Sequence, residues 1–309
     1  MRIKQVFSLI FIAAGILCAS YSCNAAAKEN KENPSAGYTF IFPDIPNNLS
    51  SPQDRAEYLI AHYWDNFDFT ADYSKADAFI EQTLVDFLSI LPIIESEDPV
   101  VKAFEALITK SAVNEKLKND IGRLIPIYLG NTDSPMRNDR LYLDYLEVWT
   151  SQPDLDRSEK MRKMDLIEML SKNMKGTQAT DFTYKTIDGK VHTMSSTLSP
   201  GSDMLLMFFN PNCDSCEGAI IEMENSQYLK KKISDGELKI LAVYSGDNVK
   251  EWKRKAAAMP ENWTIGINEN EIEESDLYYL PGLPSFYLIG ADGIIKEKEM
   301  PLSWILGEK

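Results

Sequence analysis

The chain has 309 residues, of which 44% are hydrophobic and 26% charged, a composition typical of a globular protein with room for about two domains. Its formal net charge is −15 at pH 7. This charge would repel the phosphates of a nucleic acid, so no nucleic-acid partner is expected.

The first 25 residues are expected to be a secretory signal peptide. Arg2 and Lys4 form a short basic start, and residues 6–17 are apolar. The apolar run is too short to span a bilayer in the mature protein, and small residues follow it, as they do before a cleavage site. The protein is therefore expected to be exported, and to be periplasmic or anchored to a membrane facing the periplasm or the cell surface.

The cleavage point leaves two alternatives. Cys23 stands shortly after the apolar run, where a lipoprotein would carry its lipid anchor. Cleavage after Ala25 or Ala27, which leaves the protein without an anchor, is the competing interpretation. Residues 26–37 are polar and are expected to be a flexible tether.

Residues 38–175 are expected to form an all-α domain of unknown role. Apolar residues recur at helical spacing in six segments. The first is opened by Ser51-Pro52 and the third by Asp98-Pro99, the fourth runs from about residue 114 to 129, and the second, fifth and sixth are marked by apolar residues within 79–91, 141–148 and 166–170. Pro126 is expected to kink the fourth helix. His62 lies among aromatic residues of the first helix and is interpreted as a packed or surface residue, because no second histidine or cysteine lies at metal-binding spacing.

Residues 176–309 follow a different period, that of alternating strands and helices. Apolar residues alternate up to Asp188-Gly189, which predicts a β-hairpin. Helices are expected over residues 216–232 and after a cap at Asp247. The expected strands span residues 204–209, 238–244, 263–267 and 284–289, with an antiparallel partner at 294–297. This pattern predicts a sheet with helices on both faces.

Cys213 and Cys216 are the one cysteine pair expected in the folded body, because Cys18 and Cys23 belong to the leader. The pair follows an apolar strand and opens a helix. The N-terminus of a helix favours the thiolate of the first cysteine, and the spacing of three lets the second thiol close a disulfide with it. This layout predicts a thiol–disulfide redox site that needs no other cofactor and no metal.

The CxxC pair, the βαβ unit and Leu283-Pro284 occur in an order that resembles the thioredoxin fold, and most of all the TlpA/ResA-type extracytoplasmic thiol–disulfide oxidoreductases. The helical half is similar to uncharacterised modules that precede such domains in Gram-negative envelope lipoproteins. The implied fold is an α/β thioredoxin-like C-terminal domain, with a central mixed sheet and flanking helices, preceded by an all-α N-terminal domain.

The resemblance also implies roles for four residues. Cys213 would attack a substrate disulfide and Cys216 would resolve the mixed disulfide. Pro284 would be a cis-proline facing the sulfurs, and the backbone of Leu283 would pair with an extended substrate peptide. The implied partners are disulfide- or thiol-bearing envelope proteins and an upstream reductant that resupplies electrons.

Several residues depart from the thioredoxin pattern. Asn212 replaces the tryptophan before the first cysteine, and Met207 replaces a buried aspartate that manages the proton of the resolving thiol; Glu217 is a candidate substitute. Asp214 beside the sulfur is expected to disfavour the thiolate and to give a reductant-leaning couple. Alternatively, Asp214 points into solvent and has little effect.

Three other functions compete. A peroxiredoxin usually has threonine three residues before its cysteine, where this chain has Asn210. A zinc site would need ligands beyond the cysteine pair, for which His62 and His192 are the available histidines. The third is an envelope binding or assembly protein, with a helical interaction module and a structural or vestigial CxxC, since a fold does not determine a function.

Overall fold

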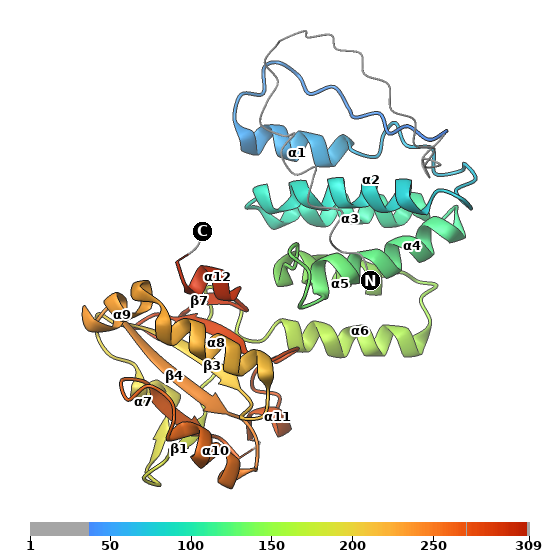
Figure 1. Cartoon of the computed structure of the whole chain (residues 1–309). Coiled ribbons are helices and arrows are strands. Elements are labelled where there is room, and N and C mark those ends of the chain that lie inside the picture. Colours follow the sequence, from blue (N-terminus) through green and yellow to red (C-terminus); the bar gives the residue numbers. More distant parts are fainter. Residues whose placement is uncertain (1–36, 270, 308–309) are drawn as a thin grey trace, which may run out of the picture.

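The computed structural model of the chain describes residues 37–269 and 271–307. Cys23 and the expected signal peptide lie outside the described residues. The helical half and the sheet half lie side by side, and the predicted order of an all-α half before a thioredoxin-like half is confirmed (Figure 1). None of the helices in these two ranges has the length and apolar character needed to cross a bilayer.

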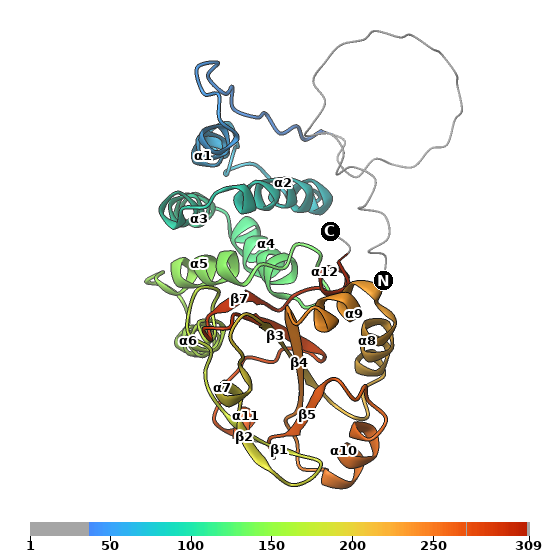
Figure 2. The ribbon, with the colours of Figure 1, turned by 90° about the vertical axis from the view of Figure 1, so that its left-hand side faces the viewer.

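The helical half stacks its helices in successive layers, from α1 at the far end to α6 beside the sheet (Figure 2). Their bounds are α1 Pro52–His62, α2 Asp77–Ile90, α3 Glu97–Ser111, α4 Glu115–Ile125, α5 Asp139–Thr150 and α6 Arg157–Leu170. The side chains of Ser51, Asn114 and Asn138 accept hydrogen bonds from the first turns of α1, α4 and α5. At Pro126 the chain continues α4 as a π-helical turn, Pro126–Gly130, which accommodates the missing N–H that was expected to kink the helix.

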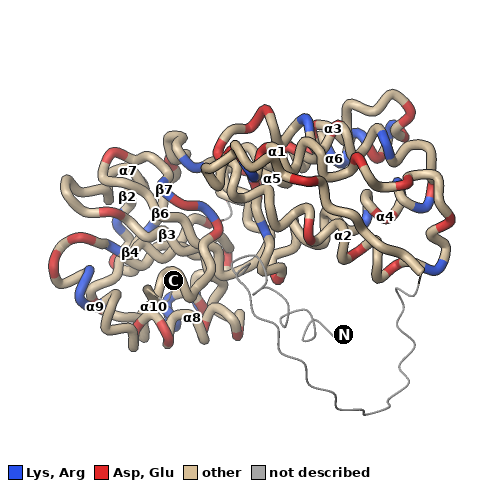
Figure 3. Tube along the Cα trace, turned by 90° about the horizontal axis from the view of Figure 1, so that it is seen from above, with Lys and Arg blue, Asp and Glu red and all other residues tan. Residues whose placement is uncertain are grey.

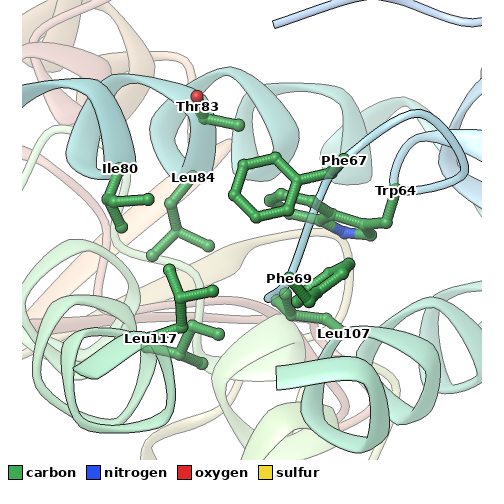
Figure 4. Close-up of a pocket in the computed structure, with 9 residues that line it drawn as sticks. Trp64, Phe67, Phe69, Ile80, Thr83, Leu84, Leu107 and Leu117 are labelled. Carbon is green, nitrogen blue, oxygen red and sulfur yellow. The ribbon is translucent and has the colours of Figure 1, made fainter. Parts of the chain in front are cut away.

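The aromatic residues after α1 form part of the core of the helical half. Trp64, Phe67 and Phe69 pack against Leu84 of α2 and Leu117 of α4 (Figure 4). The space left between them is about 10 Å³, near the smallest volume that accepts a water molecule. This aromatic cluster is therefore packing rather than a ligand groove.

The sheet half is built on seven strands in the order β2-β1-β5-β4-β3-β6-β7, within the residues described. β3 is parallel to β4, which is parallel to β5; β6 is antiparallel to β3 and to β7. The predicted mixed sheet is confirmed. The strand bounds are β1 Thr183–Thr186, β2 Val191–Thr193, β3 Asp203–Phe209, β4 Leu238–Tyr244, β5 Thr264–Ile267, β6 Ser285–Ile289 and β7 Ile295–Lys298.

Alternate residues of the central strand β3 fill two separate cores. Leu205, Met207 and Phe209 face the helices α8, α9 and α10, whereas Leu206 and Phe208 face the opposite layer. The bounds of the covering helices are α7 Met194–Thr197, α8 Asp214–Asn225, α9 Gln227–Ser234, α10 Val249–Ala256, α11 Glu271–Glu274 and α12 Leu302–Ile305.

Two predicted helix boundaries are wrong. The expected helix over 216–232 begins at Asp214 and is broken at Ser226, whose side chain accepts the N–H of Leu229 and so starts α9. α10 is capped by Asn248 instead of Asp247. In both places a side-chain hydrogen bond to the backbone determines where the helix starts, while the apolar spacing stays continuous.

Candidate functional site

Cys213 caps the N-terminus of α8, directly after the loop that leaves β3. Its Sγ accepts a hydrogen bond from the N–H of Cys216 at 3.2 Å, and its carbonyl accepts the N–H of Glu217 at 3.0 Å. The sulfur therefore occupies the place of a capping oxygen, at the positive end of the helix dipole. Both thiols are free; Cys213 is partly exposed, whereas Cys216 is 1% exposed.

The two thiols differ in acidity. Burial opposes ionisation of Cys213, but hydrogen bonds from Cys216 and Ser215 outweigh it and lower the pKa of Cys213 below its usual value. Burial is the largest influence on Cys216 and raises the pKa of this thiol to about 12. Cys213 is thus the accessible and more acidic sulfur, as a nucleophile must be, and Cys216 stays protonated until it is activated.

The segment Leu283-Pro284 lies against the sulfur. The peptide bond between these two residues is cis, as the resemblance implies. The Leu283 carbonyl oxygen lies 3.6 Å from Cys213 Sγ and accepts a hydrogen bond from Ser215 Oγ at 3.1 Å. Ser215 Oγ is also 3.0 Å from Cys213 Sγ, so one hydroxyl bridges the sulfur and the backbone of Leu283.

Ser215 is the site residue that reasoning from the sequence missed. The signal was its place in the first turn of a helix, two residues after the sulfur. Its contact with Leu283 depends on a loop 68 residues further along the chain, which no local pattern reveals.

The structure gives no support to the two acidic residues that were considered near the sulfurs. The side chain of Glu217 is 58% exposed and pairs with Lys255 at 3.3 Å. Met207 fills the position of the missing aspartate with a fully buried thioether. Asp214 is exposed and is not among the groups that shift the pKa of Cys213, which favours the solvent-facing alternative.

The histidines lie in other surroundings. His62 Nδ1 lies 2.8 Å from Asp65 Oδ2 in the helical half, and the His192 ring stacks on Tyr184 of the hairpin. In the part of the chain that the structure describes, no three residues among histidine, cysteine, aspartate and glutamate are grouped so as to hold a metal ion.

Two protein-family models match different parts of the chain. Residues 175–298 match the AhpC/TSA family, so the C-terminal half is a thioredoxin-like domain of this type, with the fold of thiol–disulfide oxidoreductases. Residues 18–173 match a domain of unknown function, DUF5106. The chain belongs to the DUF5106 family, whose helical module here precedes the thioredoxin-like domain.

One solved structure is similar to this chain over most of its length. A thioredoxin-like protein from Bacteroides caccae is 29% identical, with 87% of this chain and 97% of that chain covered and a TM-score of 0.80. The C-terminal domain of an uncharacterized protein from Bacteroides fragilis is 28% identical, over 44% and 97%, with a TM-score of 0.42. The thioredoxin domain of a thiol-disulfide oxidoreductase from Bacteroides vulgatus is 18% identical, over 41% and 89%, with a TM-score of 0.37. No curated protein matches the chain.

Proposed function

We propose that the protein is an extracytoplasmic thiol–disulfide oxidoreductase that exchanges disulfides with protein substrates through Cys213 and Cys216. The observation that carries this proposal is the contact between the Cys213 sulfur and the backbone of Leu283, at the start of α8. An accessible acidic thiol, a buried partner thiol and the backbone of Leu283 beside them are the three parts that disulfide exchange with a peptide would use.

The reaction proceeds in two exchanges. The Cys213 thiolate attacks one sulfur of the substrate disulfide, the other substrate sulfur leaves and takes up a proton, and a mixed disulfide forms. Cys216 then loses its proton and attacks Cys213 Sγ, so the substrate leaves as a dithiol and the protein holds a Cys213–Cys216 disulfide. Two electrons have passed to the substrate, and an upstream dithiol must return them. No other cofactor is needed.

The Cys213–Cys216 dithiol/disulfide pair is proposed to act mainly as a reductant of its substrates. Strong oxidants stabilise the thiolate with a histidine or another cation near the sulfur. The groups that lower the pKa of Cys213 are hydrogen-bond donors from Ser215 and Cys216, and none of them is cationic. The sulfur is therefore stabilised by hydrogen bonds and the helix dipole, without a cationic side chain among the groups that lower its pKa, which supports a modest potential.

The proposed place of action is the cell envelope. The support is the N-terminal sequence, in which Arg2, Lys4 and an apolar run precede Cys23. Lipidation of Cys23 would anchor the protein, and its substrates would then be thiol- or disulfide-bearing proteins of the same compartment.

Replacing Cys213 with serine is expected to lower the rate of insulin reduction by at least about a thousandfold, because a hydroxyl is a far weaker nucleophile at neutral pH. The assay follows the precipitation of reduced insulin with dithiothreitol as electron donor. Thermal unfolding of the variant within a few degrees of wild type controls for folding. Reduction by the variant at the wild-type rate would refute the assignment.

The same assay separates the alternatives. Wild-type protein that leaves insulin oxidised, with a CxxC bridge that resists dithiothreitol, would favour the envelope assembly protein. The AhpC/TSA match makes peroxide the second candidate substrate. Asn210 stands where a peroxidase usually has threonine, so peroxide consumption is expected to stay far slower than disulfide reduction.

A further inference from the structure

The boundary between the two halves contains four buried charged side chains, here called the junction cluster: Arg137, Asp139, Lys298 and Glu299. Arg137 and Asp139 flank Asn138, the N-cap of α5, while Lys298 is the last residue of β7 and Glu299 follows it. β7 lies on the side of the sheet half that faces the helical half (Figure 3). Their side chains are 6% to 12% exposed. Each half thus contributes one cation and one anion.

The junction cluster is held by ion pairs within the helical half and across the boundary. Arg137 Nε lies 3.1 Å from Asp139 Oδ1 within the helical half, and Arg137 Nη1 lies 3.5 Å from Glu299 Oε2 across the boundary. Lys298 Nζ lies 3.4 Å from Asp139 Oδ2 and donates to the carbonyl oxygen of Leu170 at the end of α6 at 2.8 Å. The two halves are therefore joined by specific polar contacts.

Burying these four charged side chains costs folding free energy, because each charge loses its hydration. Burial, the largest influence on both groups, raises the pKa of Glu299 to about 7 and lowers that of Lys298, as expected for charges taken out of water. Among the described residues, Arg137 Nη2 and Glu299 Oε1 find no hydrogen-bond partner. Apolar residues of the same size would often stabilise such a boundary as well or better. The junction cluster therefore calls for a role beyond holding the two halves together.

Glu299 connects the junction cluster to the redox site. Its Oε2 lies 3.3 Å from Ser285 Oγ, and Ser285 directly follows Pro284. The single proton of the Ser285 hydroxyl is shared between the carbonyl oxygen of Gly282, at 2.8 Å, and Glu299 Oε2. The hydroxyl of Ser285 thus links the short loop that carries Leu283 to the carboxylate of Glu299.

The helical half also contacts this loop directly. Tyr279 packs against the core of the helical half, while its carbonyl oxygen accepts the hydroxyl of Tyr287 at 3.0 Å. A Cβ atom placed on Gly282 would lie 3.5 Å from Thr132 Cγ2, so the segment before α5 lies against the loop. Besides the hydrogen bond from Ser215 to Leu283, the loop is therefore held at three points that involve the helical half directly or through Glu299.

We propose that the helical half positions the Leu283-Pro284 edge of the redox site, and that Arg137 is the positioning residue that acts through Glu299 and Ser285. The inference rests on the proposed exchange of disulfides with protein substrates and gives the helical half a part in it. A protein substrate needs the Leu283 backbone at a fixed distance from Cys213. A small reagent that meets only the sulfur does not.

The test compares Arg137→Met with Arg140→Met in the full chain. Arg140 lies in the first turn of α5, three residues after Arg137, pairs with Asp144 at 3.1 Å and donates to the Ile94 carbonyl oxygen, so it is a comparison arginine whose contacts stay within the helical half. Because the Leu283 edge binds the substrate and the transition state alike, its displacement in Arg137→Met is expected to raise KM for insulin about tenfold while kcat changes less than about twofold. Alkylation of Cys213 by iodoacetamide is expected to keep its wild-type rate, and Arg140→Met is expected to match wild type in all three measurements.

Hydrogen–deuterium exchange of the same proteins reports how firmly the loop that carries Leu283 is held, and this measurement does not depend on catalytic activity. Exchange in residues 279–288 is expected to accelerate in Arg137→Met, while exchange in α8 stays unchanged. Arg137→Lys, which keeps the charge but not the planar fork, is expected to restore part of the loss. If Arg137→Met does not fold, Ser285→Ala removes a single oxygen from the same path and is expected to give the same split between KM and kcat.

The outcomes separate this inference from the proposed function. Equal KM for Arg137→Met and Arg140→Met, together with unchanged exchange in residues 279–288, would overturn the inference while disulfide reduction by the wild type stands. An equal fall in insulin reduction and in Cys213 alkylation would indicate general damage to the fold and would also overturn it. Wild-type protein that reduces no disulfide would refute the proposed function, and the exchange experiment would still decide whether Arg137 holds the loop.

Discussion

Replacing Cys216 with serine is expected to stop turnover and to leave the substrate covalently attached to Cys213. Serine cannot attack the mixed disulfide, so the first exchange goes to completion and the second does not occur. The buried position of Cys216 at the first turn of α8 puts it beside the bond that it must break. Non-reducing electrophoresis followed by mass spectrometry should show a stable adduct with a cysteine-bearing protein, and reducing agent should release it.

The control for the trap is the double variant Cys213→Ser/Cys216→Ser, which lacks both sulfurs and whose thermal unfolding is compared with that of the wild type. It is expected to form no adduct. A trap applied to native envelope proteins would also identify the substrates. Continued turnover by Cys216→Ser, or an equal adduct with the double variant, would contradict the assignment of attacking and resolving cysteines.

The second large effect concerns the selectivity of alkylation. In the reduced protein near neutral pH, Cys213 is expected to react with iodoacetamide at least about a thousand times faster than Cys216, because only thiolates react and the pKa of the buried thiol is raised to about 12. The rate at Cys213 should rise with pH through its lowered pKa and then level off, since its thiolate is complete above that value. Peptide mass spectrometry across a pH series measures both rates.

The fold itself provides the control for this selectivity. In denaturant both thiols lose their surroundings and are expected to react at similar rates and with an ordinary thiol pKa. Equal reactivity of the two cysteines in the native protein would show that Cys216 is as accessible as Cys213, and the proposed order of attack would then be wrong.

Much of the sheet half could be predicted from the sequence, because its signals are local. Strand β4 begins and ends where its apolar run does, and β3 starts one residue before its run. The break at Ser226 was missed because Ile220 and Leu229 continue the apolar spacing across it, while the cap that starts α9 depends on one side-chain hydrogen bond. Asp214 neighbours the sulfur in the chain and is exposed, which favours the solvent-facing one of the two alternatives that the sequence left open.

The contacts that complete the site could not be predicted, because they join distant segments. Ser215 meets Leu283 only when the sheet has formed, and Arg137 meets Glu299 only when the two halves have packed. A charged residue in a sequence is most often a solvated one. Periodicity alone therefore could not distinguish Arg137 from the exposed arginines of the helical half.

The redox potential of the Cys213–Cys216 pair, titrated in the full-length protein against mixtures of oxidised and reduced dithiothreitol, tests the proposed function most directly. Alkylation and mass measurement at each point report the fraction of disulfide. A reversible two-electron couple at a potential near that of thioredoxin, roughly −270 mV, is the expected result. A bridge that excess dithiothreitol leaves intact, or thiols that never join under oxidising conditions, would contradict the proposal.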